Sequence, residues 1–220
     1  MIKTVIFDMD GVIIDSEPIH QEIQHQLFGL YGITLTTDEY QSFIGRSSKN
    51  MWQELIEKHT LSVSVDEVLE RDKSLYHQRL RSIQGLQPIP GIPNLINMLQ
   101  QQQTTLVLAS SSSMESIELV LELFDLTSIF SLKVSGANLQ YSKPHPEIFN
   151  VAAGLAKVEN SKCLVIEDSN HGVTAAKRAQ MKCIGYQNPN SGNQDLSQAD
   201  LIISDFHLLS WEQIKHLTDD

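Results

Sequence analysis

Short apolar runs with strand character recur along the chain, and helical patterns separate most of them. The strand-like runs are Thr4–Phe7, Thr105–Ala109, Leu132–Val134, Cys163–Ile166, Lys182–Tyr186 and Leu201–Ile203. The helical patterns are Gly91–Gln102, Met114–Phe124, Pro146–Ala156, Gly172–Ala179 and Leu208–Leu217. Strands that alternate with helices are typical of a parallel sheet with helices on both faces. We therefore expect an α/β fold, in which ligands bind beyond the carboxyl ends of the strands.

The segment from Asp15 to about Arg81 interrupts this alternation, because it contains no convincing strand. Its helical stretches are Ser16–Leu30, Thr37–Ile44, Ser48–Lys58 and Val65–Leu80. Several Gly and Pro residues between Gln84 and Pro93 mark the point at which the chain leaves this segment. We therefore predict a small α-helical domain, residues 15–83, inserted into a core domain made of residues 1–14 and 84–220.

Composition excludes several classes of partner. The formal net charge of −11 offers no general basic surface for nucleic acid. No apolar stretch reaches the ~18 residues of a membrane span, and the N-terminus lacks a signal-peptide pattern. We therefore expect a soluble cytoplasmic protein. The two cysteines, Cys163 and Cys183, fall in strand-like runs and are expected to be reduced core residues, although a disulfide stays open without a distance.

Two carboxylates follow the first strand-like run, which continues as Asp-Met-Asp-Gly-Val. Asp8 and Asp10 alternate around Met9, so in extended backbone both side chains project to the same side. Such a pair is unfavourable unless a cation lies between the carboxylates or one of them holds a proton. Gly11 lets the chain leave the strand in a conformation that few residues adopt. A polar turn is the alternative, but these acids could also supply a nucleophile and a proton donor.

A run of serines and a lysine follow later strand-like runs. Ser110 begins four serines that lead into a predicted helix, and a hydroxyl at a helix N-terminus can bind an anion. Helix capping by Ser112 or Ser113 is the alternative. Lys143 lies in Ser-Lys-Pro-His-Pro, where the prolines stiffen the chain. A fixed ammonium suits a phosphate oxygen and holds a carboxylate ionised, whereas a solvated surface lysine is the other interpretation.

Two adjacent acids, Glu167 and Asp168, end the fourth strand-like run, and a helical pattern begins near Gly172. Adjacent acids at a buried strand end are unfavourable without a cation, and oxygen ligands of this kind suit Mg²⁺. The alternative is that Asp168 caps the following helix.

Asp-x-Asp, Ser, Lys-Pro and Glu-Asp, each after its own strand, together resemble the four-motif order of the haloacid dehalogenase superfamily. The resemblance covers the whole chain, and the helical insert looks like the small cap that this family carries between its first and second motifs. The stretches Asp15-Ser16-Glu17-Pro18-Ile19-His20 and Glu167-Asp168-Ser169 are similar to the β-phosphoglucomutase-like group of phosphatases and mutases. This resemblance implies a Rossmann-like core sheet, Mg²⁺ as cofactor and a monomer.

The resemblance also implies a role for each motif. Asp8 would be the nucleophile that forms an aspartyl phosphate, and Asp10 would donate and then accept a proton. Mg²⁺ would be held by the carboxylates of Asp8 and Asp168, by the backbone carbonyl of Asp10, and by Glu167 directly or through water. The phosphoryl oxygens would be held by the Ser110 side chain, the Ser111 backbone N–H and the Lys143 ammonium.

Three cap residues are candidates for substrate contact: His20, Arg46 and Lys49. His20 matches a histidine of the related mutases near the hinge, and Arg46 falls in the cap loop that approaches the substrate. The alternatives are an exposed helix residue for His20 and a solvated loop arginine for Arg46.

Asp10 favours phosphorus chemistry over dehalogenation, because a halide leaves unprotonated whereas an alkoxide needs an acid. We expect a Mg²⁺-dependent phosphatase that acts on a small phosphorylated metabolite, with a sugar phosphate as the first candidate. The alternative is β-phosphoglucomutase, which interconverts β-glucose 1-phosphate and glucose 6-phosphate. Hydrolysis is favoured, because in Arg46-Ser47-Ser48-Lys49 the arginine that grips the second phosphate in mutases is shifted or replaced by Lys49. Arg71-Asp72-Lys73 gives no clear match to a later mutase lysine.

Two other classes fit less well. Phospho-accepting signalling modules also combine acids, a hydroxyl and a lysine at strand ends, but they are shorter, lack a helical insert and place the accepting acid on a later strand. A catalytically silent binding protein of the same fold is disfavoured, because no core catalytic position is missing.

Overall fold

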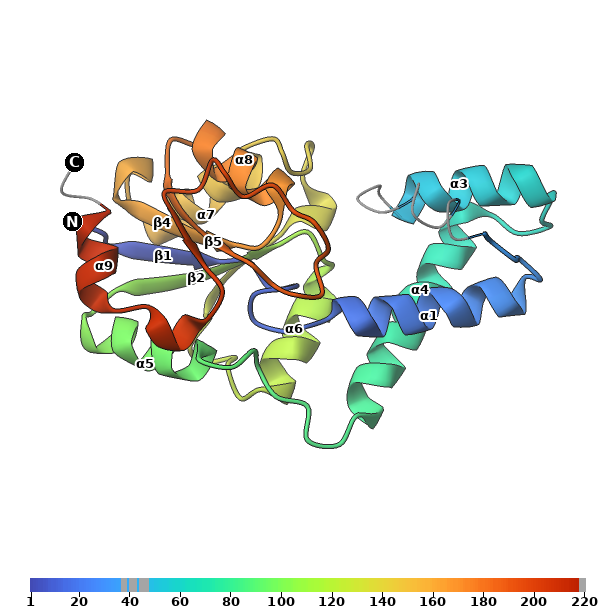
Figure 1. Cartoon of the computed structure of the whole chain (residues 1–220), viewed down its shortest axis with the longest axis horizontal. Coiled ribbons are helices and arrows are strands. Elements are labelled where there is room, and N and C mark those ends of the chain that lie inside the picture. Colours follow the sequence, from blue (N-terminus) through green and yellow to red (C-terminus); the bar gives the residue numbers. More distant parts are fainter. Residues whose placement is uncertain (37–38, 40–42, 44–47, 218–220) are drawn as a thin grey trace. The chain divides into compact units, whose positions relative to one another are not determined.

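The computed structural model describes residues 1–36, 39, 43 and 48–217 of the 220-residue chain. The chain forms two compact units (Figure 1). A core unit comprises Met1–Glu17 and Gly85–Asp220, and a helical unit comprises Pro18–Gln84.

The core unit contains a parallel sheet of six strands with the order β3-β2-β1-β4-β5-β6. The strands are β1 (Thr4–Phe7), β2 (Thr105–Ser110), β3 (Leu132–Ser135), β4 (Cys163–Glu167), β5 (Lys182–Tyr186) and β6 (Leu201–Ile203). The central strands are buried on both faces and read as continuous apolar runs, as expected for a parallel sheet. The predicted α/β fold with a Rossmann-like parallel sheet is confirmed.

Helices cover both faces of this sheet: α7 and α8 lie on one face, and α5 and α6 lie on the other (Figure 1). The core-unit helices are α5 (Ile92–Gln101), α6 (Met114–Leu123), α7 (Glu147–Ala156), α8 (Asn170–Arg178) and α9 (Trp211–His216), with short 3₁₀ turns η1 (Gly136–Asn138), η2 (Asn160–Lys162) and η3 (Phe206–Leu208). The buried cluster under α7 and α8 includes Ile6, Val107 and Val165 from the three central strands. Both cysteines are free and buried in this same cluster.

Two helices begin at other residues than the sequence pattern predicts, because serines cap them. Ser169 accepts a hydrogen bond from the Gly172 amide, so α8 begins at Asn170 rather than at Gly172. Ser210 and Gln213 form a capping box, so α9 begins at Trp211, and the preceding residues form η3 instead of helix.

The helical unit contains α1 (Glu17–Leu30), α3 (Ser48–His59) and α4 (Val65–Ser82). Its interior includes the fully buried side chains of Trp52, Leu55 and Leu27. A capping box between Ser64 and Glu67 fixes the start of α4. Most of the helix predicted over Thr37–Ile44 falls outside the described residues. None of the helices in the described part of the chain is both long enough and apolar enough to cross a membrane.

Candidate active site

The sequence motifs gather at the carboxyl edge of the three central strands. Phe7, the last residue of β1, pairs in register with Leu108 of β2 and with Ile166 of β4, and these strands end one or two residues further on, at Glu167 and Ser110. Asp8 continues β1 by one residue, and its amide donates to the carbonyl of Ile166 at 3.0 Å. The sheet register therefore brings together side chains that are more than a hundred residues apart in the sequence.

Gly11 turns the chain sharply after the first strand. Its φ of +77° is left-handed, and its amide donates to the carbonyl of Ile14 at 2.8 Å. A Cβ atom at this position would lie 2.0 Å from Oδ2 of Asp168. Glycine is thus required both by the turn and by the close approach of the carboxylate.

The side chain of Lys143 is only 8% exposed, and its ammonium bridges two carboxylates. Nζ donates to Oδ1 of Asp8 at 2.6 Å and to Oε1 of Glu167 at 2.7 Å. Burial acts to lower the pKa of Lys143, but the two carboxylates outweigh it and raise the pKa well above its usual value. The alternative of a solvated surface lysine is wrong for this residue.

The loop that carries Lys143 is held from two sides. Arg178 of α8 donates to the backbone carbonyl of Pro144 at 3.0 Å. The amide of Tyr141 donates to the Glu147 carboxylate at 2.8 Å, in the first turn of α7. Lys143 therefore approaches the carboxylates from an anchored loop.

Asp8, Glu167 and Asp168 form a buried cluster in which each residue offers an oxygen within 4.8 Å of the others. Burial is the main cause that raises the pKa of Asp8 well above its usual value; Lys143 opposes the rise, and Glu167 and Asp168 add to it. Burial, and then the charge of Glu167, raise the pKa of Asp168 to about 7. Ionised together, the three carboxylates leave two negative charges beyond the Lys143 ammonium. A cluster of buried oxygen donors with excess negative charge fits a hard divalent cation such as Mg²⁺.

Neighbouring groups fix the two acids that follow β4. The amide and the hydroxyl of Ser169 both donate to Oε2 of Glu167 at 2.9 Å. A Cβ atom at Gly172 would lie 1.7 Å from Oε1 of Glu167, so a larger residue there would displace the Glu167 carboxylate. The hydroxyl of Ser191 donates to Oδ2 of Asp168. Because Ser169 caps α8, the alternative that Asp168 is the capping residue is wrong.

Three serine hydroxyls hold the Asp10 carboxylate. Ser16 donates to Oδ1 at 2.7 Å, while Ser112 at 2.7 Å and Ser110 at 3.3 Å donate to Oδ2. Asp10 is half-buried, whereas Asp8 is buried. The two acids of the Asp-x-Asp pair thus have different surroundings: Asp8 faces the ammonium and the other carboxylates, and Asp10 faces hydroxyls.

Ser110 is fully buried at the end of β2 and does not cap α6; Ser113 does. The Ser110 hydroxyl accepts from the Ser112 amide at 3.0 Å. Ser111 is exposed, and its backbone N–H makes no hydrogen bond within the described residues. This turn therefore offers a free amide beside a buried hydroxyl, as an anion site requires.

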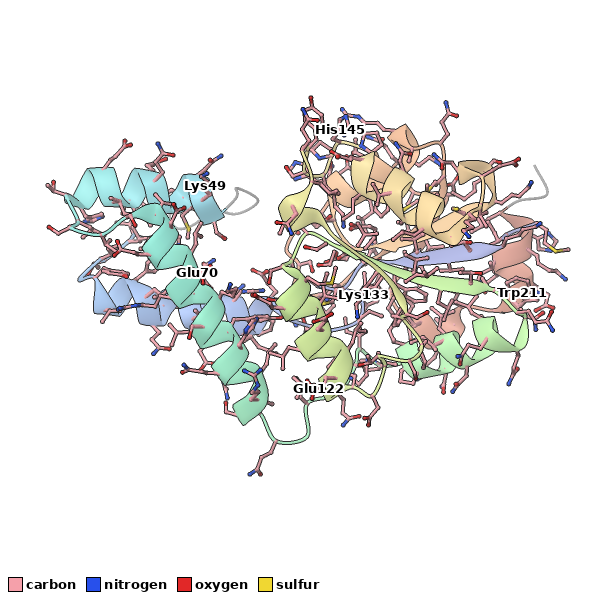
Figure 2. All side chains as sticks on the ribbon, turned by 180° about the vertical axis from the view of Figure 1, so that it is seen from behind. Lys49, Glu70, Glu122, Lys133, His145 and Trp211 are labelled. Carbon is pink, nitrogen blue, oxygen red and sulfur yellow. The ribbon has the colours of Figure 1, made fainter. Side chains whose placement is uncertain are left out.

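The three cap candidates have different outcomes. The ring of His20 stacks on Tyr76 with centroids 4.4 Å apart. Burial raises the pKa of Asp72, and the charge of His20 opposes that rise. Asp72 is therefore an electrostatic partner of this histidine. Lys49 is exposed in the first turn of α3 (Figure 2). Arg46 lies outside the described residues. Substrate contact by these three residues stays a prediction.

Comparison with known proteins identifies the family of this chain. The family model of the haloacid dehalogenase-like hydrolases matches residues 5–186. The chain belongs to this family. Among curated relatives, the validoxylamine A 7'-phosphate phosphatase of Streptomyces hygroscopicus subsp. limoneus is 28% identical over 217 residues, which cover 97% of this chain and 99% of the relative. Hexitol phosphatase B of Escherichia coli is 29% identical over 197 residues, covering 87% and 86%.

Solved structures of this haloacid dehalogenase family include a β-phosphoglucomutase from Clostridium difficile that is 27% identical to this chain. The two structures match with a TM-score of 0.83, over 100% of this chain and 98% of the other. Family membership and these relatives make the protein an enzyme of the phosphatase or phosphoglucomutase type.

Sequence reasoning missed four serines that hold the acids of this haloacid dehalogenase-like site: Ser16, Ser112, Ser169 and Ser191. Ser112 and Ser169 lie within two residues of a recognised motif, so a search for hydroxyls just beyond each motif could have found them. Ser16 lies in the stretch from Asp15 to His20 that carries the resemblance, but nothing in the sequence directs its hydroxyl to Asp10. Ser191 lies in no motif, and only the folded chain brings it to Asp168.

Proposed function

We propose that this protein is a Mg²⁺-dependent phosphatase that hydrolyses a small phosphorylated metabolite, with sugar phosphates as the substrate class. The observation that carries the proposal is the contrast between two neighbouring acids. Asp8 is buried and its carboxylate accepts from Lys143, whereas Asp10 is half-buried and its carboxylate accepts from three serine hydroxyls. A nucleophile and a proton donor on one strand end need this division of surroundings.

Asp8 acts as the nucleophile and carries the phosphoryl group as an aspartyl phosphate. Attack requires the ionised carboxylate, and burial alone would favour the protonated form. The Lys143 ammonium at 2.6 Å opposes that effect and favours the ionised form of the nucleophile. The same ammonium offsets the charge of the incoming phosphoryl oxygens.

Asp10 acts as the general acid and then as the general base. It protonates the leaving alkoxide and later takes a proton from the attacking water. Its three serine partners are hydroxyls that can rotate, so they can donate to the carboxylate and also adjust when it takes up a proton.

The metal would be held by Asp8, Asp168 and Glu167, with the backbone carbonyl of Asp10 as a further ligand. When bound, Mg²⁺ supplies charge stabilisation to the transferred phosphoryl group. The buried cluster of oxygen donors, which carries excess negative charge when its acids are ionised, supports this assignment. The phosphoryl oxygens would bind the Ser110 hydroxyl, the Ser111 amide and Lys143, and the lack of a hydrogen-bond partner for that amide among the described residues supports its part.

The helical segment, residues 15–83, acts in this proposal as the cap that selects the substrate, because the core groups recognise only phosphate. Two relatives that match over most of their length are named as a validoxylamine A 7'-phosphate phosphatase and a hexitol phosphatase, which favours hydrolysis. The β-phosphoglucomutase neighbour makes phosphoryl return to a bound sugar the second candidate.

The experiment that separates the two candidates measures phosphate release with Mg²⁺ across a panel of sugar and polyol phosphates. β-Glucose 1-phosphate is followed in parallel for conversion to glucose 6-phosphate. The proposal expects phosphate from several members of the panel and no isomerisation. Glucose 6-phosphate with little free phosphate would contradict it and establish the mutase.

The Asp8→Asn variant tests the nucleophile. Asparagine keeps the shape of the side chain but removes the attacking oxygen charge, so we expect activity to vanish while the fold is retained. Asp195→Asn is the matched control, because Asp195 is an exposed acid in the same unit. Full activity of Asp8→Asn would refute the assignment.

A further inference from the structure

The loop between β5 and β6 reaches back to the first strand end and fastens to it. The buried side chain of Asn188 donates from Nδ2 to the carbonyl of Gly11 at 3.0 Å. Its Oδ1 accepts from the Asn190 amide at 2.8 Å, and Nδ2 of Asn190 donates to Asp15 at 2.6 Å. Residues 188–194, here called the β5 loop, are therefore anchored on both sides of the turn after the first strand.

The same loop is anchored on the fourth strand end. Gln194 donates from Nε2 to the carbonyl of Ser191 at 2.9 Å, and its Oε1 accepts from the Asn170 amide at 3.0 Å. Ser191 is thus fixed through its own backbone and projects its hydroxyl onto Oδ2 of Asp168. These hydrogen bonds fix the position of Ser191 relative to Asp168.

The two oxygens of Asp168 have different surroundings. Oδ2 accepts from Ser191 and lies where a Cβ of Gly11 would be only 2.0 Å away. Oδ1 accepts no hydrogen bond from the described part of the chain. One oxygen is therefore occupied and enclosed, and the other is left as a ligand.

We propose that Ser191 is a positioning residue that restricts Asp168 to one-oxygen ligation and thereby favours Mg²⁺ over Ca²⁺. The inference rests on the metal site of the proposed function. Mg²⁺ is small and takes single oxygens in a near-octahedral arrangement, whereas Ca²⁺ accepts more oxygens and often binds both oxygens of one carboxylate. A hydroxyl that occupies Oδ2 disfavours the second mode. Groups that orient a ligand in this way influence metal affinity although they do not touch the metal.

The test is calorimetric titration of the substrate-free protein with Mg²⁺ and, separately, with Ca²⁺. In Ser191→Ala we expect the preference for Mg²⁺, measured as the ratio of the two dissociation constants, to fall by about tenfold. Ser191→Thr retains the hydroxyl and is expected to keep the wild-type ratio. Asn193→Ala, an exposed position in the same loop, is the matched control and is expected to change neither constant.

Three outcomes would overturn the inference. Ser191→Ala with the wild-type ratio would show that the hydroxyl does not select the cation. Equal weakening of both cations would show a merely structural role. A threonine variant that behaves like the alanine variant would exclude the hydroxyl as the cause.

Failure of the proposed function is distinguishable from failure of this inference. A wild-type protein that binds Mg²⁺ but releases phosphate from no substrate would contradict the phosphatase and leave the role of Ser191 standing. A wild-type protein that binds neither cation would overturn the metal site and this inference together.

Discussion

Replacing Lys143 by methionine removes the one ammonium that contacts Asp8 and Glu167 among the described residues. Methionine keeps much of the apolar stem, so the change acts mainly on charge. Lys143 donates to the two carboxylates at 2.6 and 2.7 Å, and its side chain is only 8% exposed. Hydrogen bonds to charged groups contribute about 1.5–3 kcal/mol each, so two of them give roughly 3–6 kcal/mol. Removing one partner of a buried ion pair costs about 3–5 kcal/mol, which agrees.

The loss depends on pH, because the remaining carboxylates can escape the penalty by taking up protons. Lys143 lowers the pKa of Asp8, so its removal raises that pKa further and makes protonation easier. We expect the free energy of unfolding of the metal-free variant to fall by about 3–5 kcal/mol at pH 8 and by clearly less at pH 5.

Urea unfolding followed by tryptophan fluorescence measures this loss. The sequence has two tryptophans, of which Trp211 lies in the core unit and Trp52 in the helical unit. A Trp52→Phe background therefore reports the core unit alone. Lys162→Met is the matched control, because Lys162 also pairs with a glutamate at 2.7 Å but is 40% exposed. We expect the control to lose less than about 1 kcal/mol.

The reasoning would be refuted by a Lys143→Met protein that is within about 1 kcal/mol of the wild type at pH 8. It would equally be refuted by a loss that is the same at pH 5 and pH 8, because the carboxylates would then carry no charge that needs the lysine.

Three further results are expected. Gly11→Ala should lose about 1–2 kcal/mol of unfolding free energy because of its left-handed φ, and it should also lose Mg²⁺ affinity. Gly32→Ala, with φ +65° and open space around it, is the control and should lose stability alone. Equal Mg²⁺ binding by both variants would contradict the close approach of Gly11 to Asp168. The pKa of Asp168 is raised to about 7 in the folded state, so the unfolded chain loses this proton at a lower pH than the folded protein does. The melting temperature in EDTA should therefore fall as the pH rises from about 4 to about 7. A melting temperature without this slope would contradict the raised pKa. Asp10→Asn should slow turnover of an alkyl phosphate by about 100-fold or more, yet retain a burst of nitrophenolate from 4-nitrophenyl phosphate, whose leaving group needs no proton. Loss of that burst would contradict the role of Asp10 as the acid.

The strands and the positions of the motifs at their ends could be predicted because both depend on local patterns. Apolar runs identify strands, and in a parallel sheet the residues that follow them meet at one edge. The sequence alone left Lys143 between a surface and a buried role. Only the folded chain decides this question, because the ion pairs join Lys143 to residues 135 and 24 positions away.

The contacts that orient the acids could not be predicted. Ser191 meets Asp168 across 23 residues, and Ser112 meets Asp10 across 102, in loops whose course has no periodic signal. The start of α8 was misplaced because capping by Ser169 competes with periodicity, and both fit the same stretch of sequence. The features of the site that could not be predicted from the sequence are thus the side-chain hydrogen bonds made by loop residues.

The central claim is that Asp8 carries the phosphoryl group, and trapping that species during turnover tests it most directly. The protein is mixed with substrate and Mg²⁺, stopped within milliseconds and treated with borohydride, which converts an aspartyl phosphate to homoserine. Peptide mass spectrometry then locates the modified residue. The account predicts homoserine at position 8 in the wild type and none in Asp8→Asn. Turnover with an unmodified Asp8, or with the phosphoryl group on another side chain, would contradict it.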